Sequence, residues 1–353
     1  MRAGQGVSGC GDEMDERGGA TGSPIAVMLY RAADEARRAP SLLNTQPWRW
    51  RLRGEVLELQ ADPRRQLPAI DPDGRLLIVS CGAALHHARV AIAAAGYEPR
   101  VSRWPDPARP LLLARIQDCH PRPPSLSSVL AYRSMRLRHT DRRGMAAGAP
   151  VPAGTIDALR LAAAAHHARL HTVAPDDVVY LRYAAQGAHR IASADERRAG
   201  ELRLWTSRGP DDTDGVAPQT VAAPAPRRVP LRDFGLGPAA RLAPGSGDDS
   251  SAEYCVLATD HDEPADWLAA GEAASAVWLT ATGRGLAVSP MSDVVEVPGA
   301  RMLLRSLLHP PGRPQLVLRV GVAGDPGPPP ASGRRPASEV IDASGWLGAA
   351  RGD

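Results

Sequence analysis

Apolar residues at helical spacing run through most of the chain. Ser23 followed by Pro24 suits the start of a helix, and apolar residues then recur every three or four positions, which predicts a helix to about residue 38. The same spacing predicts a helix that begins near Ser125. Further helices are predicted near residues 82–95, 155–167, 176–193, 197–205, 264–282 and 300–308.

Strands are predicted between these helices. Residues 48–53 alternate apolar and arginine side chains, and a second apolar run follows Gly54 at 55–59, which indicates a β-hairpin. Turn residues at 71–74 lead into the apolar run 76–79, ahead of the helix expected from about 82. Short apolar runs predict buried strands at residues 111–116, 253–259 and 315–321.

Residues 206–250 differ from the rest, with frequent Pro, Gly, Asp and Arg and little periodicity. A loop of this length inside a compact domain is usually a functional lid or disordered. Residues 1–23 are Gly-rich and polar, so we expect a disordered N-terminal tail.

An internal repeat links two of the predicted helices. Residues 82–84 and 96–97 resemble 271–273 and 285–286, with the same offset of 189 positions. Each helix is followed by a proline and then by a short apolar strand. This repeat predicts two similar α+β halves in tandem.

Composition narrows the chemistry. Of 353 residues, 42 are basic, and every one is Arg, so Lys-dependent phosphate loops, Schiff bases and Lys general bases are excluded. The net charge of +3 does not call for nucleic acid. Four scattered cysteines suggest neither zinc nor disulfides, and no signal peptide or bilayer-length apolar run stands out. We therefore expect a cytoplasmic protein that does not bind membranes.

An arginine-rich stretch, residues 133–143, carries five guanidiniums, one carboxylate and two hydroxyls. Guanidinium groups match phosphate oxygens bidentately, so the stretch could hold a phosphate monoester. A solvated, Arg-rich helix end is the alternative, and the motif alone leaves both open.

A polar loop at residues 40–48 lies between two prolines and places two amides and two hydroxyls within six positions. It is either part of a ligand site or a hairpin entry held by its own amides. His86-His87 invites a metal site, but neighbouring helical residues point about 100° apart and no acidic residue stands one turn away. We predict no metal.

Together, the Ser-x-x-Asn-x-Gln-Pro-Trp loop at 41–48, the Arg-His-Thr-x-Arg motif at 138–142 and the repeat resemble the flavin-dependent nitroreductase superfamily, more closely its Acg-type branch. The resemblance spans roughly residues 24–340 and implies an α+β, nitroreductase-like fold. In ordinary members two identical subunits form each FMN site. In the Acg-type branch two degenerate tandem repeats in one chain imitate that dimer, and a long segment covers the flavin.

The resemblance also assigns roles to individual residues. Arg138 and Thr140 match positions that hold the FMN phosphate, and Arg142 matches the cation that faces N1 and O2 of the ring. A fixed guanidinium there would stabilise the negative charge that two-electron reduction leaves at N1. The remaining expected FMN contacts are Ser41, Asn44 and Gln46 from the opposite half, Pro290 and Met291 near N5, and Arg334 and Arg335 at the phosphate.

Departures from the family pattern shape the expected function. Residues 30–34 lack the hydroxyl and second basic residue of a phosphate site, so one FMN per chain is expected. Residues 214–216 resemble the covering segment of the Acg-type branch, which puts nicotinamide access in doubt.

Two functional hypotheses follow. The first is an NAD(P)H-dependent FMN oxidoreductase in which hydride passes to flavin N5 and electrons then pass to a nitroaromatic or quinone, with no catalytic side chain required. The alternative is a non-catalytic protein that sequesters FMN beneath its lid. The chain lacks G-x-G-x-x-G and G-x-S-x-G motifs, which disfavours a Rossmann dehydrogenase and a serine hydrolase.

The expected organisation is a tail at 1–23, a first half at 24–124, a second half at 125–340 with the lid at 206–250, and a C-terminal tail at 341–353. A monomer would then complete one flavin site.

Overall fold

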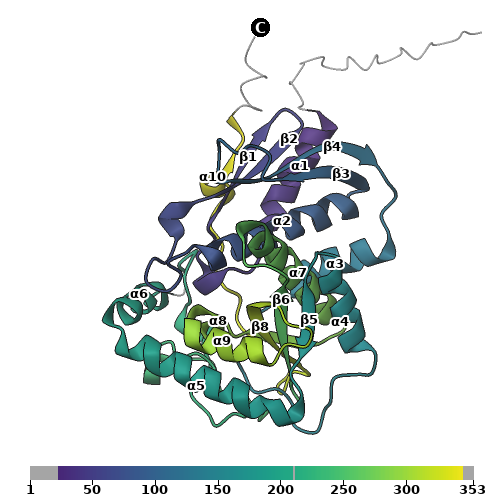
Figure 1. Ribbon diagram of the computed structural model, residues 1–353. Coiled ribbons are helices and arrows are strands. Elements are labelled where there is room, and N and C mark those ends of the chain that lie inside the picture. Colours follow the sequence, from purple (N-terminus) through teal and green to yellow (C-terminus); the bar gives the residue numbers. More distant parts are fainter. Residues whose placement is uncertain (1–22, 210, 345–353) are drawn as a thin grey trace, which may run out of the picture.

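Two β-sheets flank a central layer of helices in the computed structural model, which describes residues 23–209 and 211–344 (Figure 1). Nearly all of the predicted N-terminal tail and most of the C-terminal one lie outside the described residues. The described helices are α1 (Pro24–Ala36), α2 (Arg75–Ala94), α3 (Leu126–Leu137), α4 (Thr155–Ala164), α5 (Val178–Ala194), α6 (Glu196–Thr206), α7 (Pro264–Gly283), α8 (Asp293–Glu296), α9 (Pro298–Ser306) and α10 (Ala337–Val340).

The first sheet has the strand order β3-β4-β2-β1-β9. The predicted hairpin is confirmed, because β1 and β2 pair antiparallel with Trp48 opposite Ala61 and Gly54 in the turn. The end of the described chain returns to this sheet, where β9 pairs parallel with β1 although those residues were expected to be tail. Its strands are β1 (Trp48–Arg53), β2 (Val56–Ala61), β3 (Tyr97–Arg103), β4 (Leu112–Pro121) and β9 (Ile341–Asp342).

The second sheet has the order β5-β6-β8-β7, and all three of its pairings are antiparallel. The predicted strands at 253–259 and 315–321 are confirmed as its two central members. Every residue of β8 after Arg313 is buried, including the polar Gln315 and Arg319 among its apolar residues. The strands are β5 (Arg169–Thr172), β6 (Glu253–Thr259), β7 (Ala287–Pro290) and β8 (Arg313–Gly321).

Helix α2 begins earlier than predicted. Residues 76–79 form its first turn, because the Asp71 carboxylate accepts hydrogen bonds from the backbone N–H groups of Leu76 (3.1 Å) and Leu77 (2.9 Å). Such a cap satisfies donors that have no partner within the helix. Helix α2 is long and apolar enough to cross a bilayer, but 83% of its most apolar 18-residue stretch is buried inside the protein. Its continuous apolar character is therefore that of a core helix.

Helices α2 and α7 cross at two glycines in the centre of the molecule (Figure 1). A Cβ atom on Gly82 would lie 2.1 Å from the Leu268 carbonyl oxygen, and one on Gly271 would lie 2.0 Å from the Val79 oxygen. These contacts are reciprocal, because the offset of 189 residues relates Gly82 to Gly271 and Val79 to Leu268, as expected of two helices related by a local two-fold axis. Only glycine permits so close an approach. The origin of this symmetry in a tandem duplication stays a prediction.

The segment 206–250 is packed against the body of the protein. Val216, Val221 and Phe234 are buried in a small apolar cluster with Leu43 and Trp205, which lie outside the segment. Most of its backbone is irregular, with short 3-10 turns at residues 218–220 and 237–239. We call residues 206–250 the lid, because part of the segment covers the cavity described below.

Candidate functional site

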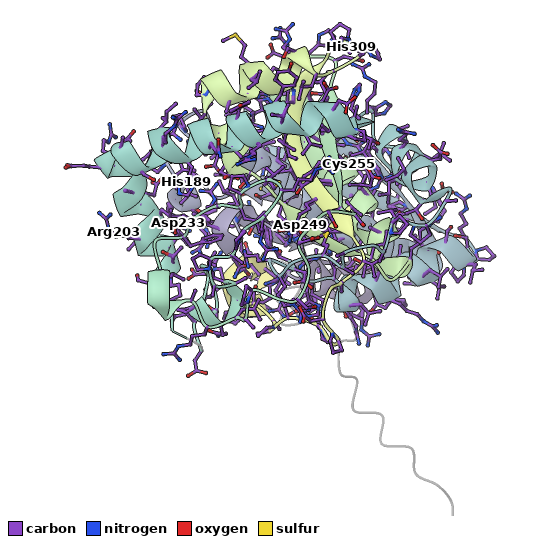
Figure 2. All side chains as sticks on the ribbon, turned by 90° about the horizontal axis from the view of Figure 1, so that it is seen from below. His189, Arg203, Asp233, Asp249, Cys255 and His309 are labelled. Carbon is purple, nitrogen blue, oxygen red and sulfur yellow. The ribbon has the colours of Figure 1, made fainter. Side chains whose placement is uncertain are left out.

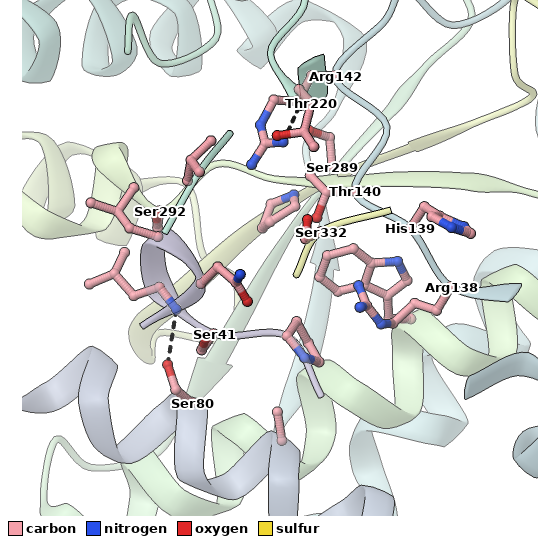
Figure 3. A pocket seen from close by; sticks show the side chains of 18 of the residues that line it. Ser41, Ser80, Arg138, His139, Thr140, Arg142, Thr220, Ser289, Ser292 and Ser332 are labelled. Atoms are coloured by element: carbon pink, nitrogen blue, oxygen red, sulfur yellow. Dashed lines mark hydrogen bonds between the residues drawn. The ribbon is translucent and has the colours of Figure 1, made fainter. Parts of the chain in front are cut away.

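A cavity of about 210 Å³ lies where residues from both predicted halves meet the lid (Figure 3). The first half contributes the loop after α1 and one face of α2, and the second contributes the end of α3, part of α7 and β7. Eight of the ten predicted site residues line it: Ser41, Asn44, Arg138, Thr140, Arg142, Pro290, Met291 and Arg334. Residues that lie far apart in the sequence thus line one cavity.

One end of the cavity holds Arg138 and Arg334. Arg138 is the C-cap of α3, is only 7% exposed and lies with its guanidinium 4.7 Å from the centre of the Trp278 ring. Its Nη2 and the Nη2 of Arg334 both donate to the carbonyl oxygen of Arg38, each at 3.2 Å. The two cations thus converge on one carbonyl from different parts of the chain.

Neither guanidinium has a carboxylate partner within the described residues. Burial lowers the pKa of Arg138, and the nearby charge of Arg334 lowers it further. The pKa of Arg334 is lowered mainly by burial and then by Arg38 and Arg37. The buried Nε atoms of Arg138 and Arg334 donate to no acceptor. Because arginine stays protonated in proteins, this end of the cavity carries positive charge that the described protein does not neutralise.

Arg142 occupies a different part of the wall (Figure 3). Its Nη1 donates to the Thr220 carbonyl oxygen at 2.8 Å, and its guanidinium lies 5.0 Å from the centre of the Phe234 ring. Thr220 and Phe234 both belong to the lid, so the lid fixes the direction of this side chain. Burial, and then the charge of Arg232, lower the pKa of Arg142.

The backbone around Arg142 rests on a buried ion pair. Arg319 and Asp249 are both 0% exposed and are joined by contacts of 2.6 and 2.7 Å. The other Nη of Arg319 donates to the carbonyl oxygens of Asp141 and Arg143, on either side of Arg142. Asp249 lies deep in the molecule at the end of the lid (Figure 2). The pair therefore joins lid, sheet and site.

The loop of Ser41, Asn44 and Gln46 has an unusual backbone. Leu43, Asn44 and Gln46 have φ of 44°, 56° and 48°, a left-handed region that costs energy for residues other than glycine. Ser41 Oγ accepts from the Gln46 backbone N–H at 2.9 Å, which closes the turn. The loop therefore lines the cavity and is also closed by its own Ser41 hydroxyl.

Asn44 and Gln46 also hold the lid. Asn44 Nδ2 donates to the carbonyl oxygens of Gly215 (3.1 Å) and Gly333 (3.2 Å), and its Oδ1 accepts from Arg334 at 3.3 Å. Gln46 does not line the cavity: its Nε2 donates to Thr213 at 2.8 Å. Both polar atoms of the Gln46 side-chain amide bond to the protein itself, because Nε2 donates to Thr213 and Oε1 accepts from Arg335. The sequence alone did not reveal these partners.

Arg335 also lies outside the cavity wall. Its backbone N–H donates to Gln46 Oε1 at 2.9 Å, and its Nε pairs with Glu339 at 3.1 Å. Arg334, its neighbour, faces the cavity. Of the predicted basic pair, one member lines the site and the other fixes the backbone behind it.

Pro290 and Met291 line the cavity from the end of β7, where the Met291 backbone N–H donates to the Val317 oxygen at 2.8 Å. Thr140 forms a parallel bridge with Val288 in the same strand. These backbone contacts place the arginine-rich stretch beside residues 289–291.

The two adjacent histidines, His86 and His87, lie elsewhere. Both of their Nδ1 atoms lie within 2.9 Å of Ser275 Oγ.

Several cavity residues were not predicted. Trp278 comes from α7, and Thr220, Arg232 and Phe234 come from the lid. The sequence signals for that segment were its Pro, Gly, Asp and Arg content with little periodicity and the motif at 214–216. Nothing in its aperiodic sequence identifies which lid residues face the cavity.

The residues present suit a phosphorylated, aromatic ligand. Two guanidiniums without a carboxylate partner in the described chain converge at one end, and a third, that of Arg142, lines the same cavity, with further polar groups from Ser41 and Thr140. A buried cation without a partner is costly, so such a set favours an anion. Guanidiniums bind phosphate oxygens bidentately. FMN has both features, a phosphate monoester and a ring that becomes anionic on reduction.

Known proteins were compared with the chain. No protein-family model matches it. A Mycobacterium tuberculosis protein provisionally named NAD(P)H nitroreductase Rv3131 is 38% identical over 328 residues, covering 90% of this chain and 92% of the relative. Another from that organism, provisionally named NAD(P)H nitroreductase acg, is 36% identical over 319 residues, covering 89% and 95%.

The solved structures that the chain matches include a nitroreductase with bound FMN from Bacteroides fragilis, at 11% identity and a TM-score of 0.36, covering 58% of this chain and 94% of that one. An FMN-dependent nitroreductase from Clostridium difficile is 15% identical with a TM-score of 0.30, covering 59% and 92%. The family assignment rests on the two Mycobacterium tuberculosis relatives, which match this chain over most of their length. The predicted resemblance is confirmed: this chain, with its α+β fold, belongs to the nitroreductase family and to its Acg-type branch.

Proposed function

We propose that this chain binds one FMN and acts as an NAD(P)H-dependent oxidoreductase. The observation that carries the proposal is a set of three guanidiniums, those of the buried Arg138 and the half-buried Arg142 and Arg334, which have no carboxylate partner in the described chain. The names of the relatives Rv3131 and acg, both NAD(P)H nitroreductases, support the same activity.

In this proposal Arg138 and Arg334 hold the phosphate, with Thr140 as a neutral donor. Arg142 holds the N1 and O2 edge of the ring, and Pro290 with Met291 lies near N5. The convergence of Arg138 and Arg334 on one carbonyl supports a common anionic ligand for both. Three residues keep supporting roles: Ser41 and Gln46 shape the loop, and Arg335 anchors the backbone behind Arg334.

FMN held in this cavity would supply the acceptor for a hydride from the nicotinamide and the donor of electrons to a nitroaromatic or quinone. The chain supplies binding and charge. Arg142 stabilises the negative charge that develops at N1, and its fixed direction avoids the cost of reorienting it during reduction. Thr220 and Phe234 of the lid contact the Arg142 guanidinium, which reduces its contact with water and strengthens its electrostatic effect. No side-chain acid or base is required.

Because the loop at 41–46 and the arginine-rich stretch belong to different predicted halves, we further propose that one chain completes the site without a partner subunit. The division at residues 124–125, the tandem duplication and a cytoplasmic location are parts of the same proposal. The reciprocal contacts of Gly82 and Gly271 support the duplication.

The test is anaerobic reduction of the FMN-loaded protein. We expect the purified protein to retain FMN. Adding NADH or NADPH should then bleach the visible absorbance of the bound, oxidised flavin. A protein that stays colourless with excess FMN contradicts the proposal. A yellow protein that neither nucleotide bleaches supports FMN sequestration instead.

Lid variants distinguish a blocked site from an inert one. Asp214 in the lid pairs with Arg65 and lies 3.4 Å from Arg208. Asp214→Asn should loosen the start of the lid and speed bleaching if the lid limits nicotinamide access. Deleting the whole lid is a poorer test, because Asp249 would be lost with it and leave Arg319 buried without its partner.

A further inference from the structure

The lid carries a cavity-lining arginine that the family resemblance does not assign. Arg232 lines the cavity, and its side chain is only 11% exposed. Its Nη2 donates to Ser292 Oγ at 3.2 Å and to a carboxylate oxygen of Glu296. The Nε–H and Nη1–H groups of Arg232 have no acceptor elsewhere in the described chain. One side of this guanidinium is therefore anchored while the other keeps free donors.

Arg232 stands at the same end of the cavity as Arg142. Phe234, two residues further along the lid, contacts the Arg142 guanidinium at 5.0 Å. Ser292, which Arg232 contacts, directly follows the Pro290-Met291 stretch in the wall. Two guanidiniums from separate segments thus lie at one end of the cavity: that of Arg142 from the arginine-rich stretch and that of Arg232 from the lid.

The anchor of Arg232 is itself buried. Glu296 has a side-chain exposure of 3%, and Asp293, on the same short helix, is 7% exposed with an Oδ1 atom that has no hydrogen-bond partner. These acidic groups compensate Arg232 in part, whereas Arg142 has no ion-pair partner among the residues that the structure describes. Removing Glu296 would therefore increase the net positive charge at this edge, and removing Arg232 would decrease it.

We propose that Arg232 is a second cation for the ring edge of the cofactor, so that the lid helps to set the preference of the site for reduced over oxidised flavin. The inference rests on the proposed binding of FMN. It gives the lid an electrostatic role beyond covering the site. Arg232 acts directly on the ring edge, while Glu296 and Ser292 hold its guanidinium in place.

The experiment measures dissociation constants of oxidised and reduced FMN, the latter under anaerobic conditions with dithionite, for the wild type and three variants. Arg232→Gln keeps a polar side chain of similar reach but removes the charge. We expect the ratio of the oxidised to the reduced dissociation constant to fall about tenfold. Arg241→Gln is the matched control, since Arg241 is an exposed arginine of the same lid, and its ratio should equal that of the wild type.

Glu296→Gln separates the electrostatic role from a simple latch. If Arg232 acts by charge, this variant should raise the ratio, opposite in sign to Arg232→Gln. If the pair merely fastens the lid, both variants should change the ratio in the same direction and expose the lid to protease. That outcome, or an unchanged ratio in Arg232→Gln, overturns the inference. Wild-type protein that binds no FMN instead refutes the proposed function itself.

Discussion

Replacing Arg138 with methionine removes a buried positive charge while retaining much of the side-chain volume. The guanidinium is 7% exposed and has no carboxylate partner in the described chain, so a phosphate would be its main counter-charge. A hydrogen bond between charged groups contributes about 1.5 to 3 kcal/mol. We therefore expect the dissociation constant of FMN to rise about tenfold to a hundredfold in Arg138→Met.

The stability of the ligand-free protein should not fall in parallel. The Arg38 carbonyl oxygen would still accept from Arg334 at 3.2 Å, so no buried acceptor is left without a donor. The variant loses a contact with Trp278 but also an uncompensated buried charge. We expect the unfolding free energy of the apoprotein to stay the same or rise. At the same FMN concentration, FMN should stabilise the variant less than the wild type. Stabilisation by a ligand increases with the ratio of its concentration to its dissociation constant.

Calorimetric titration with FMN and urea unfolding of the apoprotein measure the two quantities. Arg133→Met is the matched control, because Arg133 lies on the same helix but is exposed. It should bind FMN as the wild type does. If Arg138→Met binds FMN as tightly as this control, the phosphate lies elsewhere and the assignment of this end of the cavity is wrong.

Three further predictions concern stability, measured by urea unfolding. Gly82→Ala should lower the free energy of unfolding by about 1 to 3 kcal/mol, because its Cβ would lie 2.1 Å from a backbone oxygen. Gly187→Ala, in an open stretch of α5, should raise the free energy of unfolding by about 0.5 to 1 kcal/mol. Equal effects would contradict the close helix crossing. Asp249→Asn should cost about 3 to 5 kcal/mol by leaving Arg319 unpaired, and a loss below 1 kcal/mol would contradict that role. Burial lowers the pKa of His166 from 6.5 to about 4, so stability present above pH 6.5 should decline towards pH 4, and His166→Gln should flatten that decline.

Much of the site was predictable because its residues stand in local motifs. The loop at 41–46 and the motif at 138–142 have fixed spacings, and their relation to the repeat indicated that they meet. Arg334 and Arg335 show the limit: neighbouring residues in extended chain point to opposite sides, so a basic pair does not disclose which member faces a ligand. Here Arg334 lines the cavity and Arg335 pairs with Glu339.

The fold was predicted best where periodicity was strong, as in the hairpin and the two central strands of the second sheet. The start of α2 was missed because its first turn is buried except at the half-buried Ile78, so the apolar run 76–79 has no helical alternation of apolar and polar residues. The cap that starts it depends on Asp71, several residues upstream. In the lid, Arg232 and Phe234 acquire their positions from tertiary contacts with Glu296 and Arg142, which no local pattern specifies.

The most direct test of the central claim is the amount of FMN that one chain holds. Apoprotein reconstituted with excess FMN and freed of unbound ligand can be measured by native mass spectrometry together with flavin absorbance. We expect one FMN per single chain. A chain that retains none, or that retains FMN only as a dimer, would contradict a flavin site built from both parts of one molecule.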